Sequence, residues 1–231
     1  MRLMEKELDM DSFVACWKEF VKAKNDELFD NFDKPAERTR LVLGDKSSSI
    51  DNGSPFGDHF RNYFSNKYSY RKEDGSVDLS IYKSEFIENV SDMKIEEKVS
   101  NITQDKLNNF PKVYSVLLEQ ENVIERAYEE MHKLTYFRAN LKVLVTYIWN
   151  PSKTGDKWAY AHDRLCKNFE SILKQTNDIF PENGETDYIL VTGQKVNEKL
   201  IWKYTGFQIG SFLKQVQSYV ITNESYNEGV E

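Results

Sequence analysis

The pattern of apolar and polar residues along the chain predicts an alternation of helices and strands. Apolar residues recur every three or four positions, as on one side of a helix, in residues 11–31, 58–67, 123–138 and 157–177. Short β-type runs occupy residues 68–73, 76–83, 113–118, 142–148, 187–192 and 200–209. Residues 39–43 fit either a short strand or a helical turn.

The connections between these elements divide the chain into three parts. Residues 44–57 are polar and rich in Ser and Gly, which is typical of a flexible loop, so residues 1–56 are expected to form a helical arm that ends in this loop. Residues 57–210 then form the core, with a polar insertion at 84–111. Residues 211–231 are expected to form a tail, with a short helix followed by disorder. Whether the arm packs on the core stays open at this point.

The order of the elements predicts an α/β fold with a mixed central β-sheet flanked by helices. The dipeptide Asp74-Gly75 favours a tight hairpin between residues 68–73 and 76–83. The runs 113–118 and 142–148 are joined through a helix, which is typical of a right-handed crossover between parallel strands. The hairpin adds antiparallel strands, so the sheet is expected to be mixed, with helices on both faces.

Composition and charge limit the class of protein. The chain has 231 residues, of which 39% are hydrophobic and 30% charged, as in soluble globular proteins. Its net charge of −7 gives no overall attraction to nucleic acid, so DNA binding would need a local basic patch or a bound metal ion. The N-terminus lacks the apolar segment of a signal peptide, and no run is long enough to span a membrane, so we expect a cytoplasmic protein. Cys16 and Cys166 are expected to be reduced thiols.

Two carboxylates lie one position apart directly after the apolar run 113–118. Side chains alternate along a strand, so Glu119 and Glu121 point to the same face, where two like charges are costly unless a cation neutralises them. Asp78, early in the run 76–83, would join them if the two strands pair. These carboxylates and the Gln120 carbonyl are hard oxygen ligands suited to Mg²⁺ or Mn²⁺.

Such a metal site suits the hydrolysis of a phosphodiester bond. A divalent cation lowers the pKa of a bound water molecule and offsets charge at the scissile phosphate. Glu121 is the carboxylate expected to orient or deprotonate the attacking water. Considered singly, each of the three carboxylates is also compatible with a solvated position at a strand end.

The arrangement resembles the PD-(D/E)XK nuclease superfamily, which has a restriction-endonuclease-like fold. The resemblance is carried by the segments Gly75-Ser76-Val77-Asp78-Leu79 and Leu117-Leu118-Glu119-Gln120-Glu121, and the family order of helix, three strands, helix and strand covers about residues 58–148. The resemblance implies a DNA substrate and metal binding by Asp78 and Glu119, and the carbonyl of Gln120 is expected as a further ligand.

One position departs from the family pattern. Glu121 stands where the family usually has a lysine, which makes this an E-x-E variant. A lysine supplied by the following helix is the alternative, and Lys133 shares a helix face with Glu130 at a spacing of three residues. The basic residues near this segment are candidates for contacts with a phosphate backbone, namely Arg126, Lys133, Arg138 and Lys142. Taken singly, each one fits a solvated surface position better.

Two functions follow from these observations. The first is a metal-dependent endonuclease that cleaves DNA, as a restriction or defence component, with a homodimer or a partner protein supplying the targeting. The second is a catalytically inactive member of the fold that acts as a protein- or nucleic-acid-interaction module. Zinc chemistry has no support, because His59, His132 and His162 lack ligand spacing, and no phosphate-binding or dinucleotide-binding glycine motif occurs.

Overall fold

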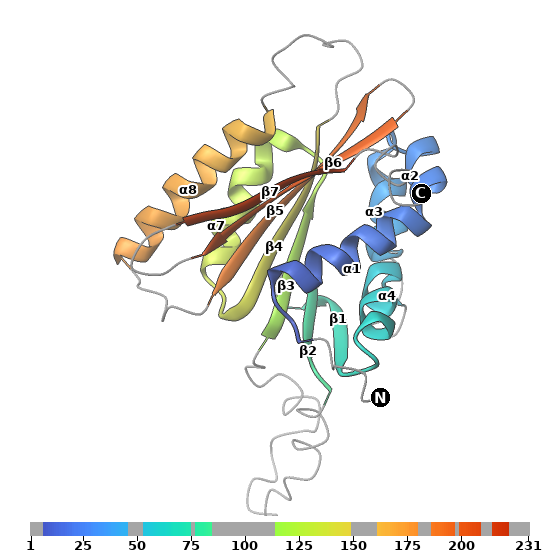
Figure 1. Cartoon of the computed structure of the whole chain (residues 1–231), viewed down its shortest axis with the longest axis horizontal. Coiled ribbons are helices and arrows are strands. Elements are labelled where there is room, and N and C mark those ends of the chain that lie inside the picture. The colour runs from blue at the N-terminus through green and yellow to red at the C-terminus, as the bar shows by residue number, and fades with distance from the viewer. Residues whose placement is uncertain are drawn as a thin grey trace, which may run out of the picture.

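The computed structural model describes residues 7–45, 53–74, 77–84, 114–148, 161–179, 186–196, 199–208 and 214–221. These residues form an α/β fold in which one mixed β-sheet lies between two groups of helices (Figure 1). The predicted insertion at 84–111 and the loop at 150–156 lie outside the described residues, apart from Ser84. The same holds for Gly75 and Ser76 of the predicted hairpin turn.

The sheet has seven strands that pair in the order of the chain. They are β1 (Tyr68–Asp74), β2 (Val77–Lys83), β3 (Tyr114–Glu121), β4 (Ala139–Ile148), β5 (Asp187–Val196), β6 (Lys199–Gln208) and β7 (Lys214–Ile221). Strands β3, β4 and β5 run parallel to one another, and all other neighbours are antiparallel. The predicted mixed sheet is therefore confirmed.

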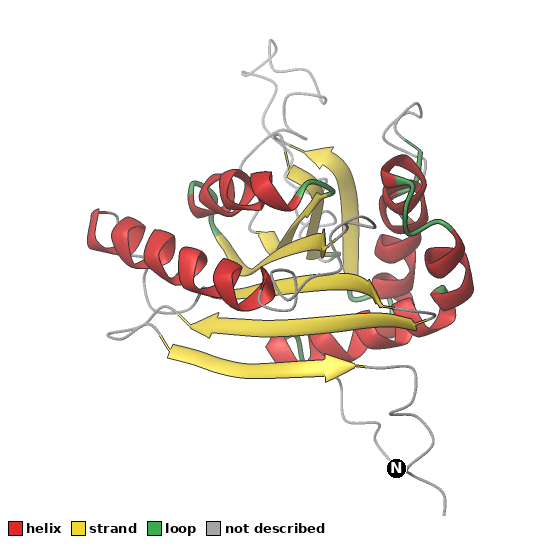
Figure 2. Ribbon diagram, turned by 90° about the horizontal axis from the view of Figure 1, so that it is seen from above, coloured by secondary structure: helices red, strands yellow, loops and turns green. Residues whose placement is uncertain are grey.

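Helices lie on both faces of this sheet, as Figure 2 shows from above. The short 3₁₀ helix η2 (Ile124–Arg126) and α7 (Ala127–Thr135) connect β3 to β4, and α8 (Ala161–Ile179) lies between β4 and β5 in the sequence. Because parallel strands are joined by right-handed crossovers, α7 and α8 share one face, where they contact each other. No helix in the described part of the chain is long and apolar enough to cross a membrane.

Four helices from the first part of the chain cover the opposite face (Figure 1). They are α1 (Met10–Ala23), α2 (Asn25–Asp30), α3 (Pro35–Leu43) and α4 (Pro55–Tyr63). Local signals set their starts: Asp9 and Ser12 form a capping box before α1, and Ser54 caps α4 by accepting from the Gly57 N–H. Proline occupies the first helical position of both α3 and α4, where its missing N–H costs nothing.

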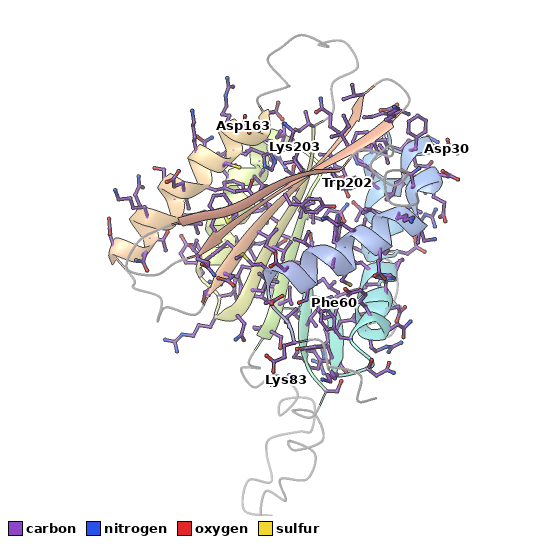
Figure 3. All side chains as sticks on the ribbon, in the orientation of Figure 1. Asp30, Phe60, Lys83, Asp163, Trp202 and Lys203 are labelled. Carbon is purple, nitrogen blue, oxygen red and sulfur yellow. The ribbon has the colours of Figure 1, made fainter. Side chains whose placement is uncertain are left out.

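These N-terminal helices pack on the sheet and do not form a separate arm. The buried Trp17 of α1 lies 4.8 Å from the Phe56 ring of α4 and 5.8 Å from the Trp202 ring of β6. Phe60 and Trp202, labelled in Figure 3, belong to the same buried cluster. A second cluster on the other face joins α7 and α8 to the sheet, with Met131 and Phe169 fully buried. The question that the sequence left open is thereby answered.

Several predicted boundaries change in the structure. The helix predicted at 11–31 is broken at Lys24 into α1 and α2, and residues 39–43 belong to α3. The short helix predicted in the tail is wrong for residues 214–221, which form β7 by pairing with the edge of β6. Pairing with a neighbouring strand can override the local propensity for a helix. The local sequence pattern carries no information about that neighbour.

Candidate functional site

The site forms where β2 and β3 pair next to α7. Leu79 of β2 is paired with Leu118 of β3, so the strand pairing on which the sequence prediction depended is confirmed. Asp78 precedes Leu79 and reaches the end of β3, where its Oδ2 accepts a hydrogen bond of 2.8 Å from the Gln120 N–H. Asp78 is half-buried and Glu119 is only 1% exposed, so two carboxylates meet in a largely desolvated place.

A lysine from α7 reaches these carboxylates. Lys133 Nζ lies 2.8 Å from Glu119 Oε1 and 2.6 Å from Glu130 Oε2. Lys133 and Glu130 lie three residues apart on one face of the helix, and α7 packs against β3 and β4. A lysine of the helix that follows β3 thus lies beside the carboxylates, as the alternative of a helix-supplied lysine requires.

The charges in this cluster do not balance. Burial and the neighbouring Asp78 raise the pKa of Glu119 to about 8, and Lys133 offsets only part of this effect. Burial likewise raises the pKa of Asp78, although the Gln120 N–H and Lys133 favour its charged form. Burial alone would lower the pKa of Lys133, but hydrogen bonds to Glu119 and Glu130 outweigh it, and the net shift is upward. Lys133 therefore stays charged, while ionisation of both Glu119 and Asp78 would leave excess negative charge, so Glu119 holds its proton up to about pH 8.

Glu121 has a different environment from Glu119. It lies inside β3, where it pairs with Thr146 of β4, because the strand continues three residues past the predicted end at Leu118. Its Oε1 accepts a hydrogen bond of 2.6 Å from the Val123 N–H, at the turn into η2. Glu121 still lines the same pocket as Asp78 and Glu119, with its Oε1 engaged by the Val123 N–H.

These side chains line a pocket with a volume of about 240 Å³. On the side of α7 it is lined by Asp78, Glu119, Glu121, Glu130 and Lys133. The opposite side is formed by residues that the sequence did not indicate as part of a site, among them Thr39 of α3, Lys72 of β1 and Asn122. No local motif marks these positions, because only the packing of α3 and β1 brings Thr39 and Lys72 to the end of β3, where Asn122 follows Glu121 directly.

Lys142 does not belong to the site, so it is not one of the residues that contact a phosphate there. It is fully buried in β4, its Nζ donates a 2.9 Å hydrogen bond to the Tyr188 hydroxyl, and it lies 4.9 Å from the centre of that ring. Leu141 and Val143 beside it point to the other face of the sheet, so Lys142 faces the cluster under α7 and α8. Arg126 and Arg138 are exposed and do not line the pocket.

The donor set suits a divalent cation of the Mg²⁺ type. In the described part of the chain, no group of three or more His, Cys, Asp or Glu side chains has the arrangement of a metal site. The chemistry nevertheless fits, because Asp78 and Glu119 are adjacent hard oxygen donors whose pKa values are both raised, in part by burial that a cation would compensate.

Comparison with known proteins found no match for this chain. The chain matches no model of a protein family, and neither curated proteins nor solved structures give a match. The case for a function therefore depends on the geometry and chemistry of the pocket.

Proposed function

We propose that this chain is a metal-dependent endonuclease that hydrolyses phosphodiester bonds in DNA, on a restriction-endonuclease-like core with an E-x-E motif. The observation that carries the proposal is the convergence of Asp78, Glu119 and Lys133, from β2, β3 and α7, in one pocket. The order α4, β1, β2, β3, α7, β4 supports it, because this is the order of helix, three strands, helix and strand on which the resemblance depends.

Asp78, Glu119 and the Gln120 carbonyl would hold Mg²⁺ or Mn²⁺ at this place. When bound, the ion supplies a water of lowered pKa and offsets charge at the phosphate. Glu121 has one oxygen held by the Val123 N–H, which fixes the carboxylate so that the other oxygen orients the attacking water. The buried setting of Glu119 strengthens each of these interactions, because water screens them poorly there.

In this proposal Lys133 has the role of the lysine that the family motif usually carries at position 121. Its side chain is 30% exposed, so it can turn from Glu119 toward a phosphate oxygen in the pocket. Glu130 holds it at 2.6 Å and keeps the ammonium close to the site during that change. With a net charge of −7 the chain has weak general affinity for DNA, so a homodimer or a partner protein would supply the targeting.

The test is cleavage of supercoiled plasmid DNA in Mg²⁺ or Mn²⁺. The wild-type chain is expected to nick the plasmid, and Asp78→Asn and Glu119→Gln to lower the rate by at least about 100-fold, since each removes charge from the reacting centre. Glu129→Gln is the matched control, because Glu129 lies on the exposed side of α7 and does not line the pocket. Nicking that survives Asp78→Asn would reject the assignment.

A second function is an interaction module without catalysis. The observation in its favour is that Lys133 already forms an ion pair with Glu119, which joins α7 to β3 without a metal ion, and a second ion pair with Glu130 within α7. Titration calorimetry with Mn²⁺ separates the two functions. Absence of Mn²⁺ binding together with absence of nicking in either metal would favour the interaction module.

A further inference from the structure

The pocket has a second wall, on the other side of β3 from the carboxylates. Gln120 alternates with Glu119 and Glu121 along β3, so its side chain turns to the opposite face of the sheet. Asn122 follows the end of the strand and donates a hydrogen bond to Thr39 on the same side. Gln120 and Asn122 line the same pocket as Asp78, Glu119 and Glu121. Thr39 of α3 and Lys72 of β1 complete the second wall, so the pocket has one side rich in carboxylates and one side of neutral polar groups with a single lysine among its described lining residues.

The Gln120 side chain on this wall is only half satisfied. The residue is 8% exposed, and its Nε2 donates a 3.0 Å hydrogen bond to the hydroxyl of the buried Tyr147. Its Oε1 is buried and has no hydrogen-bond partner among the described residues. A buried oxygen left without a donor costs about 1–3 kcal/mol, so such an atom beside a pocket points to a ligand that donates to it.

The groups around Gln120 hold the wall in place. Asn122 Oδ1 accepts a 3.2 Å hydrogen bond from Arg38 Nε, and Asn122 Nδ2 donates a 2.8 Å hydrogen bond to Thr39 Oγ1. Arg38 is fully buried, also donates to the Phe32 carbonyl, and lies 4.3 Å from the centre of the Tyr147 ring. The same buried arginine thus supports both Asn122 and the ring that holds Gln120, so binding needs only a local movement that exposes the buried Gln120 Oε1.

We propose that Gln120 is a specificity residue that accepts a hydrogen bond from the nucleotide next to the scissile phosphate. The inference rests on the proposed function, which places that phosphate at Asp78 and Glu119 on the other side of the same pocket. The donor is an N–H or O–H group of the nucleotide: an amino group of the base where the strand is DNA, as proposed above, or the 2′-hydroxyl of the ribose where the strand is RNA. A site built to bond such a group rejects an analogue that lacks it, because the buried oxygen then stays unpaired.

The experiment measures binding separately from cleavage, by fluorescence anisotropy in Ca²⁺. The probes are three short single-stranded oligonucleotides that differ only in their central nucleotide: deoxyadenosine, its analogue without the 6-amino group, and adenosine. The wild-type chain is expected to bind one donor-bearing probe about 10-fold more tightly than the probe that lacks the group, as one hydrogen bond allows. A preference for deoxyadenosine over the analogue identifies the base, and a preference for adenosine over deoxyadenosine identifies the sugar.

Gln120→Met keeps the length of the side chain and removes the acceptor, so the preference should disappear. Gln175→Met is the matched control on α8, where Gln175 is exposed and donates a hydrogen bond to the Ser171 hydroxyl. The comparison of probes on the wild-type chain tests the inference even if Gln120→Met fails to fold. Equal binding of the three probes, binding of none, or a preference that persists in Gln120→Met would overturn the inference. If the preference is absent but cleavage depends on Asp78, the proposed nuclease stands and only the role of Gln120 is rejected. If the preference depends on Gln120 but no cleavage occurs, only the proposed nuclease is rejected.

Discussion

At the scale of single residues, the carboxylates of the site differ because of what surrounds each one. Glu119 is buried beside Asp78 and has a pKa of about 8, so near neutral pH it exchanges a proton with solvent. Glu121, two residues along the same strand, gains a hydrogen bond from the Val123 N–H. The E-x-E motif therefore places one titrating carboxyl and one backbone-anchored carboxylate in the same pocket.

Glu119 should make the stability of the metal-free chain depend on pH. Its folded pKa of about 8 lies above the ordinary value of 4.5, so the folded state holds the proton more tightly than the unfolded state does. Its contribution to stability is therefore fully present below about pH 4.5 and is lost as pH rises toward 8. Glu119→Gln, which cannot ionise, should remove this fall and raise the melting temperature at pH 8 by roughly 5 °C. The melting temperatures of the wild-type chain and the variant are measured by circular dichroism at pH 6 and pH 8. An unchanged pH dependence in the variant would contradict the raised pKa of Glu119.

Removal of Lys133 should be costly at the same pH. Lys133→Met takes away the cation at 2.8 Å from Glu119 Oε1 and leaves that buried carboxylate without compensation. Because Lys133 is partly exposed, we expect a loss of about 2 kcal/mol at pH 8, below the cost of breaking a fully buried pair, and less at pH 5, where Glu119 takes up a proton. The double variant with Glu119→Gln should recover most of the loss. Urea unfolding of both single variants and the double variant gives the coupling, and additive losses would show that the two side chains do not interact.

At the scale of elements, the sequence predicts what local periodicity and turn chemistry encode. The hairpin of β1 and β2 and the succession β3, α7, β4 follow from such patterns, and they bring Asp78, Glu119 and Lys133 together. The wall around Thr39 and Asn122 was not predicted, because the packing of α3 against the end of β3 joins residues more than eighty positions apart. Lys142 was misassigned for the same reason: its partner, Tyr188, lies on another strand.

Helix α8 is attached to the sheet by a polar contact in an otherwise apolar interface. The buried His162 has both ring nitrogens within hydrogen-bond distance of threonine hydroxyls, with Nδ1 at 2.7 Å from Thr192 on β5 and Nε2 at 2.8 Å from Thr205 on β6. Burial, with a smaller effect of Lys203, lowers the pKa of His162 to about 4, while Asp163 acts in the opposite direction. Figure 3 labels Asp163 and Lys203 at this end of α8. The histidine is therefore neutral at physiological pH.

This contact should weaken in acid. The folded pKa of His162 lies below its ordinary value of 6.5, so the unfolded state binds the proton more tightly, and stability falls as pH drops from about 6.5 toward 4. His162→Gln should be less stable than the wild-type chain at pH 7 by about 1–2 kcal/mol, because a hydrogen bond is lost, but should lack this acid-dependent fall. Because Glu119 acts in the opposite direction over part of this range, the comparison is made in the Glu119→Gln background, by urea unfolding at pH 7 and pH 5. If the free energy of unfolding falls by the same amount between pH 7 and pH 5 with and without His162, protonation of His162 is not the cause of the acid-dependent loss.

At the scale of the whole molecule, the site lies where two separate hydrophobic layers meet the end of one strand. The layer under α1 to α4 positions Gln120 through Tyr147, and the layer under α7 and α8 positions Lys133. Neither layer alone completes the pocket, since Thr39 comes from α3 and Lys133 from α7. The N-terminal helices are thus part of the architecture of the site, although they precede every strand of the sheet.

Metal binding should therefore stabilise the whole fold, and its pH dependence should carry the signature of Glu119. A cation at Asp78 and Glu119 needs Glu119 ionised, so binding releases a proton while the pH is below about 8 and becomes tighter as pH rises through this range. At a concentration 100 times its dissociation constant, Mn²⁺ should add about 2.7 kcal/mol to the free energy of unfolding. We expect a rise in melting temperature at pH 8, a smaller one at pH 6, and almost none in Asp78→Asn, while Glu129→Gln should respond like the wild-type chain. Calorimetry in buffers of different ionisation enthalpy counts the released protons, and a Mn²⁺ effect that persists in Asp78→Asn would place the cation elsewhere.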